Sequence, residues 1–212
     1  MEKATREFFD KRGPVVVKNL RKHYFEAYYC ATRAEALEQV LALMPAGSTV
    51  GWGGAISAAQ VGVQEAVHAG DYKVIDRDQF SNPAEKLRCM RECFNADFFI
   101  TGANAISLDG QMVNIDGNGN RVGMIVYGPK NIIVVAGMNK VCATLEDAVK
   151  RARTVAAPMN QQRFGLPNPC TGTGVCADCL SDTSICNEIL ITRNCKPAGR
   201  IKFVLVGEEL GF

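Results

Sequence analysis

The sequence of 212 residues lacks a charge excess and long apolar runs, and it has only two histidines. Its 24 Lys and Arg residues nearly balance its 22 Asp and Glu residues, so charge favours neither nucleic acid nor an acidic membrane as a partner. No apolar run approaches the roughly 20 residues that span a bilayer, and the charged start "MEKATREFFDKRG" lacks the apolar segment of a secretory signal. We therefore expect a cytoplasmic protein with no membrane span and no nucleic-acid partner.

The usual nucleotide-binding motifs are also missing. The stretch "TVGWGGAISAAQVG" predicts a strand that turns into a helix through Gly51, Gly53 and Gly54. It has no third glycine at the dinucleotide offset and no following Gly-Lys-Ser/Thr, so neither a nicotinamide cofactor nor ATP is expected. Backbone N–H groups at such a turn, with the Ser57 hydroxyl, can hold a phosphate or a carboxylate. The alternative is that the glycines only make a tight turn.

Strand-like and helix-like segments alternate from about residue 25 to 157, which predicts the α/β class. "DFFITGA" and "NIIVVAG" are continuous apolar runs, typical of strands buried on both faces of a mostly parallel sheet flanked by helices. Between them, Asp109-Gly110 predicts a hairpin turn. We expect an α/β domain over 1–164, a cysteine-rich loop insertion over 165–199, and a last strand over 200–212 that returns to the domain.

Several of these motifs together resemble a known superfold. A buried strand ends in Thr101-Gly102-Ala103-Asn104, a hairpin follows, and the loop with Asn120-Arg121-Val122-Gly123 precedes a helix and another buried strand. This order resembles the glucosamine-phosphate deaminase, ribose-phosphate isomerase and coenzyme A transferase superfold (NagB/RpiA/CoA transferase-like). With "STVGWGGAISAAQVG" and the closing "GRIKFVLVGEELGF", the chain resembles the LUD domain family, that of lactate utilization protein C.

The resemblance implies a role in the oxidative utilization of lactate or a similar 2-hydroxy acid, beside iron–sulfur or flavin-type oxidoreductase subunits. We expect a small anionic ligand between the 51–57 turn and the 102–123 segment. The candidate ligand-binding residues are Gly51, Gly53, Gly54, Ser57, Gly102, Asn104, Asn120, Arg121 and Gly123.

Whether the chain is an enzyme stays open. The candidate catalytic residues are Asn104, Asp109 and Asp116. Asn104 stands where isomerases of the superfold carry a carboxylate, and an amide cannot act as a general base.

Nine cysteines in a cytoplasmic chain favour metal binding or reactive chemistry over disulfides. Cys170, Cys176, Cys179 and Cys186 follow the spacing C-x5-C-x2-C-x6-C, which can supply four thiolates to zinc or to a [4Fe–4S] cluster. A redox pair at Cys176 and Cys179, or plain reduced thiols, are the alternatives.

Two other functions therefore compete with the LUD-type role. One is an iron–sulfur electron-transfer or assembly subunit that acts through the cysteines. The other is a non-catalytic domain that binds a ligand or a partner and carries structural zinc. The sequence leaves the substrate and the oligomeric state open, a homo-oligomer included.

Overall fold

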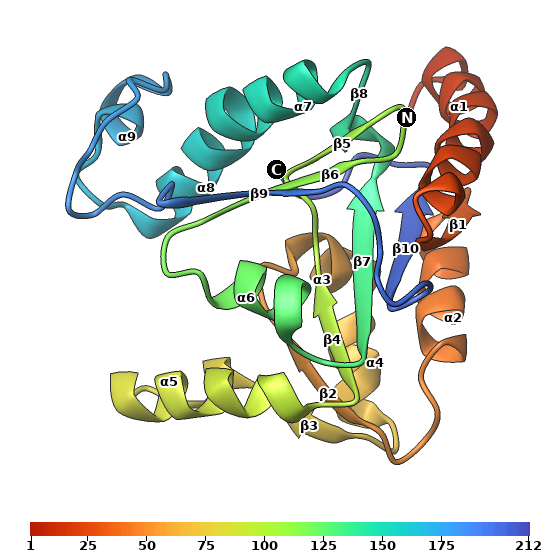
Figure 1. Ribbon diagram of the computed structural model, residues 1–212, viewed down its shortest axis with the longest axis horizontal. Helices are drawn as coiled ribbons and strands as arrows, with labels where there is room; N and C mark the ends of the chain where they lie inside the picture. The colour runs from red at the N-terminus through yellow and green to blue at the C-terminus, as the bar shows by residue number, and fades with distance from the viewer.

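A parallel sheet of six strands forms the centre of the computed structural model, which describes residues 1–212 (Figure 1). Each neighbouring pair of strands is parallel. The predicted α/β class with a mostly parallel sheet is thus confirmed. In spatial order the strands are β1 (Glu26–Cys30), β10 (Ile201–Val206), β7 (Asn131–Gly137), β4 (Phe98–Thr101), β2 (Thr49–Trp52) and β3 (Lys73–Ile75).

Helices bury both faces of this sheet, which is why its strands are apolar without alternation. Phe99 packs in the core cluster on one face and Ile100 in the cluster on the other. The first face is covered by α1 (Lys3–Lys22), α5 (Pro83–Glu92) and α6 (Asn120–Tyr127). The second is covered by α2 (Arg33–Ala42), α3 (Ile56–Val61) and α4 (Val63–Ala69).

The apolar spacing of "SAAQVGVQEAVHAG" predicts one helix that Gly70 ends, but the structure has two helices here, α3 and α4. Gly62 has a φ of 90°, a left-handed conformation that ends α3 and lets α4 start in a new direction. Short 3-10 turns occupy Arg77–Gln79, Cys93–Asn95 and Met138–Lys140. None of the helices combines the length and the apolar content that crossing a membrane requires.

A second sheet of four strands lies beside the first. Its strands, in spatial order, are β8 (Val141–Cys142), β5 (Ala105–Ser107), β6 (Met112–Asp116) and β9 (Glu188–Thr192). The turn with Asp109 and Gly110 joins the antiparallel β5 and β6, as predicted, and Gly110 has a φ of 103°. A continuous helical stretch covers this sheet, made of α7 (Leu145–Arg151), a π-helical turn (Ala152–Ala156) and α8 (Ala157–Phe164).

The cysteine-rich segment follows α8. It forms α9 (Pro169–Thr173), an irregular stretch, and then β9. In Figure 1, α9 and the chain after it stand at one end of the molecule, beyond α8. Residues 188–192, inside the range expected to be a loop insertion, instead pair with β6 in antiparallel register, so the segment is tied to the second sheet. The chain then returns through β10, between β1 and β7.

Candidate functional site

Loops at the carboxyl ends of β2 and β4 lie in contact. The Gly102 N–H donates to the Gly54 carbonyl at 3.1 Å, and the Thr101 hydroxyl donates to the Gly53 carbonyl at 2.8 Å. Parallel strands place their following loops at one edge of the sheet, where open α/β folds bind ligands. Two of the predicted ligand-binding segments therefore meet.

Arg121, from α6, joins these loops and is 8% exposed. A Cβ on Gly54, whose φ is 60°, would lie 2.8 Å from the Arg121 Cδ, so glycine is needed for this close approach. The guanidinium donates from Nη2 to the Asn104 Oδ1 at 3.1 Å and from Nε to the Asp116 Oδ1 at 3.0 Å. The structure thus brings together Gly54, Asn104 and Arg121.

Asp116, the last residue of β6, caps the start of α6 as well as pairing with Arg121. Its Oδ2 accepts the backbone N–H groups of Arg121 at 2.8 Å and Val122 at 3.0 Å, which satisfies free donors of the first helical turn. Gly119, with a φ of 66°, lets the chain turn into the helix. Both carboxylate oxygens of Asp116 are therefore engaged within the protein, which suits a structural role better than that of a general base.

Three other candidate residues lie apart from this edge or serve packing. A Cβ on Gly51, inside β2, would lie 2.6 Å from the Cys93 Sγ. Gly123 packs in α6 against the Phe94 ring. Asp109 sits in the hairpin turn, where the hydrogen bond from the Ser107 hydroxyl is the main cause that lowers its pKa. Asn120, the remaining candidate, is the first residue of α6.

Sequence reasoning missed Lys140, which follows β7 at the same edge of the sheet. Lys140 is 4% exposed, its Nζ donates to the Ser57 Oγ at 3.0 Å, and it forms no ion pair. Burial, together with the positive charges of Arg151 and Arg121, lowers the pKa of Lys140 to about 7. An ammonium group in this place carries a desolvation cost that no carboxylate offsets.

Arg151 of α7 is a second cation without a carboxylate partner. Its Nη1 donates to the backbone carbonyl of Asn104 at 2.6 Å, and burial lowers its pKa. Lys140, Arg151 and Arg121 therefore lie in one region, and the only carboxylate paired with any of them is that of Asp116, which pairs with Arg121.

The sequence did contain an indication that Lys140 lies at the site, because Lys140 closely follows the glycine that ends a buried strand. Arg151 lies within a helix and carried no such signal.

The segment Glu208–Gly211, after β10, covers Lys140 and Ser57. A Cβ on Gly211 would lie 2.8 Å from the Ser57 Oγ and 3.0 Å from the Lys140 Nζ. The segment is fastened by the Leu210 N–H, which donates to the Asn139 Oδ1 at 3.1 Å, and by the Gly211 N–H, which donates to the Gln60 Oε1 at 2.7 Å. The Met138 N–H also donates to the Glu208 carbonyl at 3.1 Å, and the Glu208 carboxylate pairs with Arg33 at 2.9 Å. Leu210 is 1% exposed and belongs to the core cluster on the second face of the sheet. The segment is therefore a packed part of the fold that shields Lys140 and Ser57 from solvent.

The four predicted metal ligands line one cavity of about 130 Å³ between α8 and the cysteine segment. No three His, Cys, Asp or Glu side chains lie close enough together to hold one metal ion. The thiols therefore surround a space and do not converge on one point. Desolvation of the Cys186 thiol, together with the neighbouring thiols, raises its pKa to about 11. Cys195 lies elsewhere, in the core against the first sheet.

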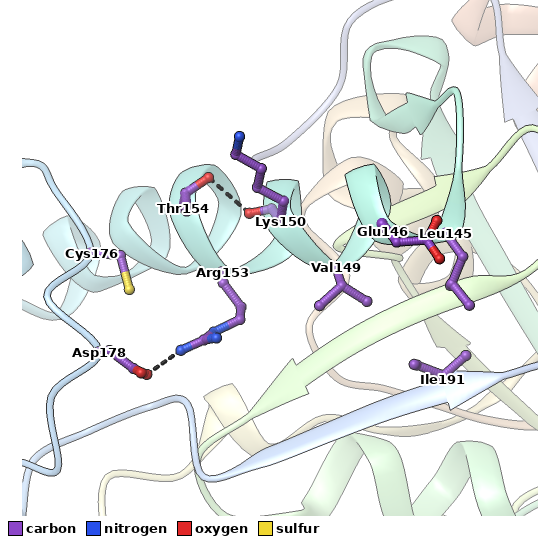
Figure 2. A pocket seen from close by; sticks show the side chains of 9 residues that line it. All are labelled: Leu145, Glu146, Val149, Lys150, Arg153, Thr154, Cys176, Asp178 and Ile191. Atoms are coloured by element: carbon purple, nitrogen blue, oxygen red, sulfur yellow. Dashed lines mark hydrogen bonds and ion pairs between the residues drawn. The ribbon is translucent and has the colours of Figure 1, made fainter.

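A wider groove of about 570 Å³ adjoins this cavity between α7, the π-helical turn and β9 (Figure 2). Figure 2 shows the ion pair of Arg153 with Asp178 beside Cys176 at one end of the groove, and Ile191 of β9 at the other. Arg153, Cys176 and Asp178 line both spaces. The ion pair thus lies between the groove and the cysteine cavity.

Comparison with known proteins identifies one family. A family model described as LUD domain matches residues 14–206. No curated protein matches the chain.

Solved structures add similarity of fold. A DUF162 family protein from Deinococcus radiodurans is 12% identical with a TM-score of 0.51, over 95% of this chain and 97% of that one. The ribose 5-phosphate isomerase A of Methanocaldococcus jannaschii is 15% identical with a TM-score of 0.36, over 53% of this chain and 55% of its own. That of Neisseria gonorrhoeae is 16% identical with a TM-score of 0.35, over 53% and 54%. The similarity to the DUF162 structure therefore extends over nearly the whole chain.

Proposed function

The chain belongs to the LUD domain family, and on that premise we propose that it binds a small carboxylate of the 2-hydroxy or 2-oxo acid class at the carboxyl edge of its six-stranded sheet. In this role it supports the oxidative utilization of lactate or a similar acid. The family association with lactate utilization supports the class of ligand. The positive charges of Lys140 and Arg151 support this location for the binding site.

The observation that carries the proposal is the buried Lys140, which has a hydroxyl as its hydrogen-bond partner and no counter-ion. An ammonium group has three N–H donors, so two remain for a ligand. Arg151 adds a second cation that no carboxylate neutralises. A bound carboxylate would offset both charges in a region of low dielectric, where such an interaction is stronger than in water.

The surrounding residues hold these cations in position. Asn104 accepts from Arg121 through its side chain and from Arg151 through its backbone carbonyl. Gly54 gives the Arg121 side chain the room that it needs. Asn104 is thus a positioning residue, which accounts for an amide where the isomerases have a carboxylate.

Ligand entry requires the segment Glu208–Gly211 to open, because it covers Lys140 and Ser57. The ligand-binding role does not itself oxidise the acid. Removal of two electrons from a 2-hydroxy acid needs an acceptor, which partner subunits of the iron–sulfur or flavin type supply.

Calorimetric titration with L-lactate, D-lactate, pyruvate and inorganic phosphate tests the proposal. We expect binding of at least one of the organic acids and a loss of about 10- to 100-fold in affinity in Lys140→Met, from the roughly 1.5–3 kcal/mol of a charged hydrogen bond. Lys130→Met is the matched control, because Lys130 precedes the same strand at its opposite end and is exposed. Absence of binding by all four probes, or equal losses in both variants, would refute the anion site.

A further inference from the structure

Cys170, Cys176, Cys179 and Cys186 line one cavity, and the buried side-chain amide of Gln161, which has no hydrogen-bond partner, lines it too. We propose that these four cysteines hold a [4Fe–4S] cluster there. Each thiol gives up its proton and binds one iron of the entering cluster, so four protons are released. This site is separate from the anion site and does not depend on it.

The backbone around the cavity is ordered by contacts that need no metal. The Gln162 side chain donates to the Cys170 carbonyl at 2.8 Å. The Asn168 side chain donates to the Thr183 carbonyl at 3.0 Å and accepts from the Thr183 hydroxyl at 3.1 Å. These bonds connect α9 to α8 and to the chain before β9. The thiols are therefore presented on a largely preformed frame, which lowers the conformational entropy lost when a cluster binds.

Gln161 of α8 is a second observation, separate from the cysteines, that points to a bound group in this cavity. It is 1% exposed, lines the same cavity, and has no hydrogen-bond partner at its Nε2 or its Oε1. Leaving a buried polar group without a hydrogen-bond partner is costly, and native proteins rarely do so. The Nε2 group is a donor of the kind that the sulfur atoms of a cluster accept.

The size and spacing of the site favour a cluster over one zinc ion. The cavity of about 130 Å³ is several times the ≈ 30 Å³ that one water molecule occupies in the liquid. Zinc would draw all four sulfur atoms to about 2.3 Å from one point, whereas the thiols here surround a space. A cubane cluster matches this arrangement because each thiolate binds a different iron at a different corner.

The walls of the cavity are mainly apolar apart from the thiols. Pro158 and Ile185 supply apolar surface, and the ion pair of Arg153 with Asp178 also lines the cavity. The guanidinium of Arg153 is the one cationic group on the wall that could face the net negative charge of a [4Fe–4S] core with four thiolates. The cluster would lie next to the groove of Figure 2, with the pair of Arg153 and Asp178 between them.

The test is anaerobic reconstitution of the full chain with sulfide and equal amounts of ferrous and ferric iron, which together have the oxidation level of a [4Fe–4S]2+ core, followed by metal and sulfide analysis and a visible spectrum. We expect about four irons and four sulfides per chain and a broad visible absorbance that dithionite bleaches. The double variant Cys176→Ser/Cys179→Ser should lose the absorbance and retain less than a quarter of the iron. Cys195→Ser should retain both, since a hydroxyl can replace the thiol that accepts from the Ile201 N–H and donates to the Pro197 carbonyl.

Gln161→Leu separates a role at the cluster from a role in folding. We expect this variant to keep its iron and to show a lower reduction potential, because a donor to cluster sulfur stabilises the reduced form. An unchanged potential would remove Gln161 from the proposal. One zinc per chain that iron does not replace, no iron after reconstitution, or equal loss of iron in Cys195→Ser would overturn the cluster. Iron binding unchanged in Lys140→Met would show that the two sites are independent.

Discussion

Replacement of Lys140 by Met should abolish a specific dependence of stability on pH. Burial lowers the pKa of Lys140 to about 7 in the folded protein, while an unfolded lysine has a pKa of about 10.4. Between these values the unfolded state keeps a proton that the folded state has lost, so the free energy of unfolding rises with pH. Below pH 7 both states are protonated, and this gain is absent.

The size of the effect follows from the same two values. Integrated from pH 7 to pH 9, the linkage amounts to about 2 kcal/mol of added stability in the wild type. The charged groups facing Lys140 are Arg151 of α7 and Arg121 of α6, and both keep their charge over this range. Lys140→Met places an apolar chain of similar length in the site and removes the titration.

Urea denaturation of both proteins at pH 7, 8 and 9 measures the effect. We expect the wild type to gain about 2 kcal/mol relative to Lys140→Met over this range. Thiols such as Cys30, whose pKa burial raises to about 11, contribute with the opposite sign. They are the same in both proteins, so the difference between the two isolates Lys140. Parallel curves for the two proteins would refute the burial of an ionisable, uncompensated lysine.

Three further predictions concern the same edge of the sheet. Affinity of the wild type for its carboxylate should fall by up to about tenfold per pH unit between pH 7.5 and 9, because the ligand binds protonated Lys140. Titrations in this range should show no such slope in Lys140→Met. Gly54→Ala should cost about 1–3 kcal/mol of stability, since it forces a side chain into a φ of 60° and against Arg121. Urea denaturation beside Gly172→Ala, where a Cβ meets nothing, checks this, and equal stability of the two would contradict it. Asp116→Asn should cost about 3–5 kcal/mol, because it leaves Arg121 buried without its partner. Thermal unfolding measures that loss, with the exposed Asp182→Asn as the control. A change under about 1 kcal/mol would mean that the ion pair of Asp116 with Arg121 contributes no more than an exposed ion pair does.

Local sequence determined the elements of the fold. Continuous apolar runs such as "NIIVVAG" and "DFFITGA" specify strands buried on both faces, and Asp109-Gly110 specifies the hairpin turn. These properties depend on neighbouring residues alone. The order of the strands does not, because β10, almost last in the chain, lies between β1 and β7 through contacts that are distant in sequence. The break at Gly62 and the pairing of β9 with β6 are likewise outcomes of packing.

The candidate sites divide in the same way. Glycine turns and cysteine spacing are visible in the sequence, since they reflect local conformation and chemistry, and both directed attention to regions that the structure brings together. Burial is different, because it depends on every element that covers a residue. Lys140 becomes a cation without a counter-ion only under the segment after β10, and Gln161 becomes an unpartnered amide only when the cysteine segment folds over α8. The sequence by itself thus determined which reactive groups the protein has. The tertiary structure decided which of them are withdrawn from water without a partner inside the protein, because burial depends on every element that packs over a residue.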